Sequence, residues 1–154
     1  MLQHVLTIAS QLAISDQISQ LASYINALDG FTFSQLPAPA PPFAVTTLWY
    51  SSVQGTAVES RHRVISPSGK EIYSVPLLGG VFAPGQSRFR QHNMIAGFLI
   101  SEQGDHWIVA ENKIDGKWHE GGRIPLQVVI AKPTPATSDA GAVNRVRASA
   151  LPRK

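Results

Sequence analysis

The 154-residue chain has no cysteine, so disulfide bonds and thiolate metal sites are excluded. Charged residues make up only 15% of the sequence and hydrophobic residues 44%, which excludes a disordered chain over most of the length, because enough apolar surface exists to offset chain entropy. No apolar run approaches the length of a membrane-spanning helix, and the first fifteen residues lack the basic start of a secretory signal. We therefore expect a soluble, cytoplasmic protein that does not engage a membrane.

The positive charge is concentrated at the C-terminal end. The formal net charge is +3, and the last ten residues contain no acid but four bases, which are Arg145, Arg147, Arg153 and Lys154. From Pro133 onward the sequence has further prolines, scattered small residues and no periodicity. These features predict a single domain over residues 1–132, followed by a disordered basic tail over 133–154.

The stretch from His106 to Ile130 predicts a β-hairpin. Asp115-Gly116 lies between two alternating segments, and this dipeptide is the strongest short-range hairpin signal. A two-residue turn there pairs Ile114 with Lys117, Asn112 with His119 and Ile108 with Arg123. In this register one apolar face carries Trp107, Val109, Ile124, Leu126, Val128 and Ile130. Such a face needs a second sheet to cover it.

Period-two alternation continues through most of the chain and predicts further strands. The first is Val5 to Ile14, with Leu6, Ile8, Leu12 and Ile14 on its apolar face. Phe43 to Val53 is expected as a central strand and Met94 to Ser101 as a buried strand. Val58 to Ser66 and Glu71 to Val75 form a hairpin that turns at Ser66-Pro67-Ser68-Gly69. Trp49 and Trp107 are expected in the core. The pattern predicts an all-β fold, an antiparallel β-sandwich of about eight strands with a Greek-key, immunoglobulin-like or C2-like topology.

The segment from Leu21 to Ser34 is ambiguous. Apolar residues from Ile18 to Leu28 recur at helical spacing, and Gly30 could end such a helix. Tyr24 and the Phe31-Thr32-Phe33 segment instead favour a long strand that bends at Gly30. Residue patterns alone leave both structures open.

Several segments together resemble an uncharacterised family of small bacterial β-sandwich proteins. The similar parts are the strand Leu21 to Asp29, the turn Ser66-Pro67-Ser68-Gly69 and the terminal strand motif Pro125-Leu126-Gln127-Val128. The resemblance covers about Ile8 to Ile130, and it implies a strand from Leu21 to Ser34. It implies no activity, since that family is defined by its fold. The loop from Gly79 to Asn93 is longer and richer in glycine than the family pattern, so a partner-specific surface is expected there.

No motif indicates catalysis, a metal or a cofactor. The five histidines show no compact ligand spacing, and a Gly-x-Ser-x-Gly elbow is absent. Glu111 and Glu120 lie roughly opposite each other on the predicted hairpin and could form a glycosidase pair, although a hairpin tip of mixed charge is the commoner meaning. We therefore expect a protein that is not an enzyme, with no catalytic, cofactor-binding or metal site.

Two groups of residues are candidate partner contacts. Trp118 and His119 follow the hairpin turn, where few core neighbours are expected, and an exposed Trp is a typical contact residue. Arg88, Arg90 and His92 alternate around Phe89, a spacing that could bind a phosphate backbone, although alternating arginines also protect strand edges.

These candidates give three hypotheses. The first is a non-enzymatic binding or adaptor protein that engages another protein, with a homodimer through a strand edge as one form. The second is a nucleic-acid-binding accessory protein that uses Arg88, Arg90 and the basic tail. The third is a carbohydrate-binding sandwich that uses Trp118. The sequence identifies neither the partner nor the biological process.

Overall fold

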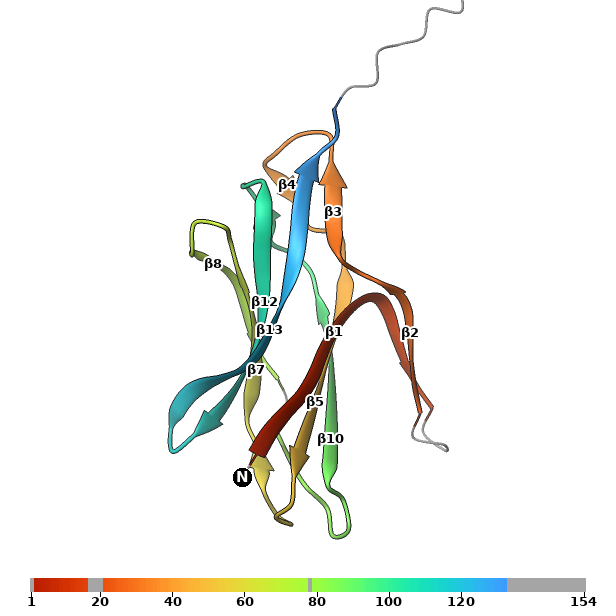
Figure 1. Cartoon of the computed structure of the whole chain (residues 1–154), viewed down its shortest axis with the longest axis vertical. Coiled ribbons are helices and arrows are strands. Elements are labelled where there is room, and N and C mark those ends of the chain that lie inside the picture. The colour runs from red at the N-terminus through yellow and green to blue at the C-terminus, as the bar shows by residue number, and fades with distance from the viewer. Residues whose placement is uncertain (1, 17–20, 78, 133–154) are drawn as a thin grey trace, which may run out of the picture.

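The protein is all-β. The computed structural model describes residues 2–16, 21–77 and 79–132, and these residues form strands and no helix (Figure 1). The described residues form thirteen strands, many of them short, where about eight were expected: β1 (Leu2–Ser15), β2 (Ala22–Ala27), β3 (Gly30–Phe33), β4 (Ala38–Pro39), β5 (Phe43–Ser51), β6 (Ala57–Val58), β7 (Ser60–Ile65), β8 (Glu71–Pro76), β9 (Gly80–Val81), β10 (Arg88–Ile95), β11 (Leu99–Ile100), β12 (Gly104–Ile114) and β13 (Lys117–Ile130). The predicted basic tail lies outside the described residues.

Two large sheets contain most of the strands. One has the order β10-β5-β1-β2 and the other the order β3-β13-β12-β7-β8, while β11-β4 and β6-β9 form small two-stranded sheets. Neighbouring strands run antiparallel, except for β3 and β13, which run parallel. Buried side chains from both large sheets form one apolar cluster that includes Val45, Val64, Ile108 and Leu126. The two sheets therefore pack face to face over a shared core.

The predicted turn of the β12–β13 hairpin is confirmed. Asp115 and Gly116 both have positive φ, 50° and 76°, which is the requirement of a two-residue type I′ turn. The pairs nearest the turn are those predicted, Ile114 with Lys117 and Asn112 with His119.

The register changes farther from the turn, and there the prediction is wrong. Ile108 pairs with Ile124 instead of Arg123, because a β-bulge at Gly121 adds one residue to β13. A Cβ atom at Gly121 would lie 2.8 Å from the ring of Trp49, so glycine here lets the indole pack against the β13 backbone. Trp49 is 1% exposed, as expected for a core residue.

The bulge moves Trp107 to the other face of the sheet. A one-residue slip reverses the face of every side chain beyond it. His106, Ile108 and Ala110 consequently point into the protein, while Trp107 is only half-buried, with the Arg123 guanidinium 5.6 Å from its ring. The expectation of a core Trp107 is therefore wrong, whereas Leu126 and Val128 are buried as expected.

The first strand buries the opposite face from the one predicted. Thr7 and Ala9 are buried, whereas Leu12 and Ile14 are nearly half exposed. The strand also has an irregularity between His4 and Leu6. Alternation in β1 predicted the strand but not its inner face, because small and hydroxyl side chains fill the space between the sheets here.

The segment from Leu21 to Ser34 is extended, as the resemblance implies. It forms two strands, and these belong to different sheets: β2 pairs with β1, and β3 pairs with β13. A side chain at Gly30 would collide with the backbone carbonyl of Gln127, so glycine permits the close parallel approach of β3 to β13. The predicted bend is thus a crossing between sheets.

The prediction of the second hairpin is confirmed, whereas the prediction of one buried strand from Met94 to Ser101 is wrong. The β7–β8 hairpin turns at Ser66 to Gly69 as predicted, and the Gly69 amide donates to the Ser66 carbonyl at 2.9 Å. The apolar run is not one buried strand, because β10 ends at Ile95 and β11 begins at Leu99. Met94 and Leu99 are more than half exposed.

Candidate functional site

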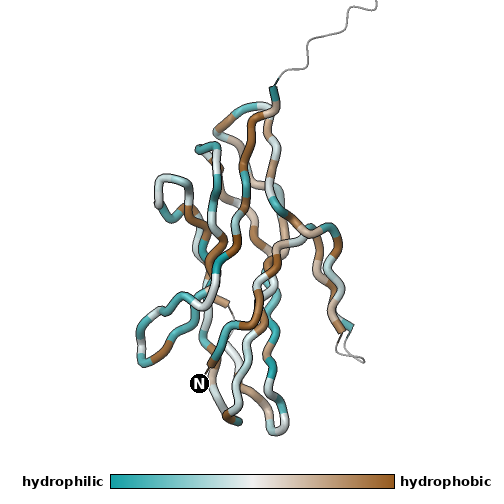
Figure 2. Tube along the Cα trace, viewed as in Figure 1, coloured by the Kyte–Doolittle hydropathy of each residue, from teal (hydrophilic) through white to brown (hydrophobic). Residues whose placement is uncertain are grey.

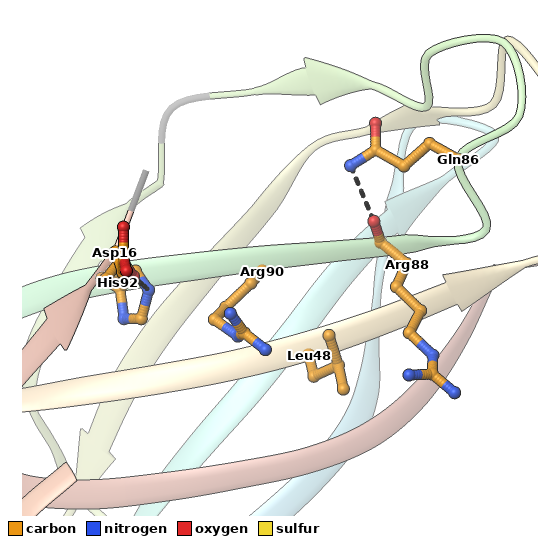
Figure 3. Close-up of a pocket in the computed structure, with 7 residues that line it drawn as sticks. Asp16, Leu48, Gln86, Arg88, Arg90 and His92 are labelled. Carbon is orange, nitrogen blue, oxygen red and sulfur yellow. Dashed lines mark hydrogen bonds between the residues drawn. The ribbon is translucent and has the colours of Figure 1, made fainter. Parts of the chain in front are cut away.

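A hollow of about 490 Å³ lies between the end of β1, at Ser15 and Asp16, and the outer face of the β10-β5 part of its sheet (Figure 3). We call it the arm hollow, and the β1–β2 hairpin beyond Ser10 the arm. The arm hollow is lined by Ser15, Asp16, Leu48, Gln86, Arg88, Arg90 and His92. Three of the five predicted contact residues therefore meet in one place.

The strand register explains why these side chains share a face. Arg88, Arg90 and His92 occupy alternate positions of β10, and alternate residues of a strand project to the same side. Arg90 lies directly opposite Leu48 of β5. The contribution of the arm was not predicted, because Ser15 and His92 are far apart in the sequence.

His92 ties the arm to the sheet. Its Nε2 atom is 2.7 Å from the Ser15 hydroxyl, and its Nδ1 atom is 2.8 Å from the Thr46 hydroxyl. Partial burial, and secondly the positive charge of Arg90, lower the pKa of His92 below its ordinary 6.5. The imidazole is therefore neutral at pH 7, and it positions the arm through hydrogen bonds without adding charge to the arm hollow.

A second hollow of about 360 Å³ lies beside β10. It is lined by Pro76, Leu77, Gly79, Phe89, Arg90, Gln91, His92 and Asn93. It includes part of the glycine-rich loop for which a partner surface was predicted.

Trp118 and His119 lie at a different site, the tip of the β12–β13 hairpin. The guanidinium of Arg61 is 4.4 Å from the Trp118 ring centroid, and the Lys113 ammonium is 5.6 Å from it. These are cation–π distances, so cations of the protein itself already occupy the aromatic surface. His119 is exposed near the turn. The five predicted contacts thus form two separate groups.

The carboxylates at this tip are engaged by arginines. Glu111 is buried and forms ion pairs with Arg61 and Arg63. Glu120 pairs with Arg123, and the hydrogen bonds from Arg123 lower the pKa of Glu120. Glu111 and Glu120 lie opposite each other, as predicted, but each has a structural partner.

A polar chain that the sequence did not reveal crosses the interior. The His4 Nε2 atom is 2.8 Å from the Thr7 hydroxyl, which is 3.0 Å from the Thr47 hydroxyl, which is 2.8 Å from His62 Nε2. His62 is fully buried, and burial lowers its pKa to about 4. Period-two alternation assigns Thr7, Thr47 and His62 each to one face of a strand, but it does not show whether that face is buried.

The arm carries almost no charge. Between Val5 and Leu28 the sequence contains a single charged residue, Asp16. Leu12, Ile14 and Ile25 lie on one face of the arm and are 45%, 48% and 41% exposed. Figure 2 shows this part of the chain in brown and pale colours between short teal segments, whereas the β12–β13 tip is mainly teal and pale.

Within residues 2–16, 21–77 and 79–132 no three His, Asp or Glu side chains are grouped to hold a metal ion. The same residues contain no helix that could cross a membrane. No model of a known protein family matches the chain, and no curated protein matches it either. The resemblance to small bacterial β-sandwich proteins remains a prediction.

Proposed function

We propose that this protein is a non-enzymatic β-sandwich that acts by binding another protein chain, and that the bound chain is a second copy of itself. The observation that carries this proposal is the uncharged edge strand β2 together with the exposed apolar face of the arm. The strand order and the face-to-face sheets support a sandwich, and the parallel β3–β13 pair beside antiparallel neighbours supports an immunoglobulin-like topology.

The four edges of the two large sheets differ in their protection. Edge strands usually carry charge, are short or are covered, because an open edge pairs with other strands. Strand β10 carries Arg88 and Arg90, β8 begins at Glu71 and ends at Pro76, and β3 has only four residues. Strand β2 has no charge and no proline. It is therefore the edge best suited to receive another strand.

A second copy is the partner that best matches this edge. Two β2 strands related by a twofold axis pair antiparallel without any like-charge contact, since neither contains a charge. The same axis brings the apolar face of each arm next to that of its mate. Strand β2 has six residues, whereas a standard interface has about 20–30 residues a side. We therefore expect a small contact and a dissociation constant in roughly the micromolar range.

The other hypotheses have less support. The Trp118 ring carries the guanidinium of Arg61, which leaves less of its surface for a sugar. Glu111 and Glu120 are neutralised by arginines, which argues against an acid–base pair.

The test is the molar mass in solution across a wide concentration range, measured by sedimentation equilibrium. We expect the wild-type mass to rise from monomer towards dimer, and Ile25→Lys to remain monomeric. Val81→Lys is the matched control, because Val81 is an exposed apolar residue of β9 and the substitution adds the same charge. A wild-type protein that stays monomeric, or an equal loss of dimer in both variants, would disprove the proposal.

A further inference from the structure

We propose that the arm hollow binds the phosphate group of a ligand, with Arg88 and Arg90 as the residues that contact it. The proposal does not depend on dimer formation, because the hollow is complete within one chain and the exposed face of Leu12, Ile14 and Ile25 is not part of its lining.

The two arginines have the spacing of a clamp. They are two residues apart on one face of β10, so their Cα atoms are separated by about 7 Å. The planar guanidinium presents paired N–H donors that match the oxygens of phosphate, and arginine keeps its charge at all physiological pH values. Arg88 forms no salt bridge with any described residue, so its charge remains for a ligand.

The rest of the lining favours a ligand that carries one anionic group. Asp16 is the only acid among the lining residues, so the side chains of Asp16, Arg88 and Arg90 give a formal charge of +1 when His92 is neutral. Leu48 contributes an apolar surface opposite Arg90. The volume of about 490 Å³ is within the range of small-molecule sites, and it exceeds the size of phosphate alone. The hollow therefore has room for a phosphate and for part of the group attached to it.

The walls of the arm hollow are held in place from two sides. The Gln86 side-chain amide donates to the Arg88 backbone carbonyl at 2.7 Å (Figure 3). The side-chain Oε1 atom of Gln86 accepts from the Ala83 backbone amide at 3.1 Å. On the other side, His92 is bonded to the Ser15 and Thr46 hydroxyls. His92 and Gln86 are thus positioning residues, and we do not expect either to contact the phosphate directly.

Two sources could supply the phosphate, a small phosphate-bearing metabolite or the backbone of a single-stranded nucleic acid. Two arginine contacts to a single strand predict a slope of about −1.4 for log affinity against log salt concentration. A much steeper slope would require more cations than the hollow holds.

The experiment is a titration of the full-length protein with inorganic phosphate at low salt, monitored by NMR. A second titration uses a short single-stranded oligonucleotide. We expect shifts at the β10 amides, and a loss of affinity of about tenfold in Arg88→Gln and in Arg90→Gln. Lys117→Gln is the matched control, since it removes one positive charge from the exposed β12–β13 tip and should leave affinity unchanged. Ile25→Lys should also keep phosphate binding, which separates this proposal from the dimer.

The outcomes decide both the site and the source. Phosphate binding that is lost in the two arginine variants and kept in Lys117→Gln supports the site, and competition by the oligonucleotide with the shallow salt slope assigns nucleic acid as the source. Phosphate binding without such competition assigns a small ligand. The proposal is overturned if phosphate causes no shifts, or if all three charge-removing variants weaken binding equally.

Discussion

The arm and the β12–β13 hairpin are both two-stranded extensions of a large sheet, yet their surfaces are opposite in character. The β12–β13 hairpin covers its outer face with pairs formed inside the chain: Arg61 with Glu111, Lys113 with Glu59, and Arg61 with the Trp118 ring. The arm leaves Leu12, Ile14 and Ile25 exposed and has one charged residue. The difference indicates that the β12–β13 hairpin is complete within the monomer, whereas the arm is suited to an external partner.

The largest effect is expected from Gly121→Val in β13. A Cβ atom here meets the buried Trp49 ring at 2.8 Å, so the added side chain must displace the indole or the strand. We expect the free energy of unfolding to fall by about 3 kcal/mol, as measured by urea denaturation.

His119→Val is the control for this substitution. It places the same side chain two residues earlier on the same strand, at an exposed position, and should change stability by less than about 0.5 kcal/mol. Equal stability of the two variants would show that the bulge does not depend on glycine.

An intermediate effect is expected from Glu111→Gln. This change leaves Arg61 and Arg63, whose side chains are 22% and 23% exposed, without their buried carboxylate. Removing one partner of a buried pair is strongly destabilising, and partial exposure of the arginines reduces the cost to about 2 kcal/mol. Lys113→Gln, which breaks the exposed pair with Glu59, should cost below about 1 kcal/mol in the same denaturation experiment. A larger loss for Lys113→Gln than for Glu111→Gln would reverse this ranking.

The smallest effect is expected on the arm. Ile14→Thr keeps a β-branched residue and changes a side chain that is 48% exposed, so the stability of the monomer should change by less than about 0.5 kcal/mol. Denaturation is to be measured at a concentration below that of dimer formation. If the monomer lost more than about 1 kcal/mol, the Ile14 side chain would pack on the body of the protein, and the contrast between the two hairpins would be wrong.

Much of the strand pattern could be predicted from the sequence, because alternation and turn residues are local signals. The Asp115-Gly116 turn and the Ser66 to Gly69 turn are where their dipeptides indicate. The faces were harder to predict. The Gly121-Gly122 pair is the sequence feature that indicates a bulge. A regular register without this bulge places Trp107 on the wrong face of the sheet.

The candidate site could be predicted in part. Arg88, Arg90 and His92 were expected to share a face, since that follows from spacing within one strand. Ser15 and Asp16 were not expected beside them, because the fold of the arm over the sheet is a long-range contact with no local pattern. The ring contact between Trp118 and Arg61 also joins distant segments, so the sequence could not show that this aromatic surface is occupied.

The hydrogen-bonded chain from Thr7 through Thr47 to His62 links the two large sheets, and it makes the stability of the folded protein sensitive to acid. Between pH 6.5 and about 4 an unfolded chain takes up a proton at His62 that the folded chain excludes. The stability that this burial contributes is complete above pH 6.5 and is lost as the pH falls through the folded pKa of about 4. Between pH 7 and pH 4.5 the free energy of unfolding should fall by about 2 kcal/mol on this account, and His62→Gln should remove that part of the pH dependence. The buried His62 imidazole thus contributes to the loss of folded protein in acid.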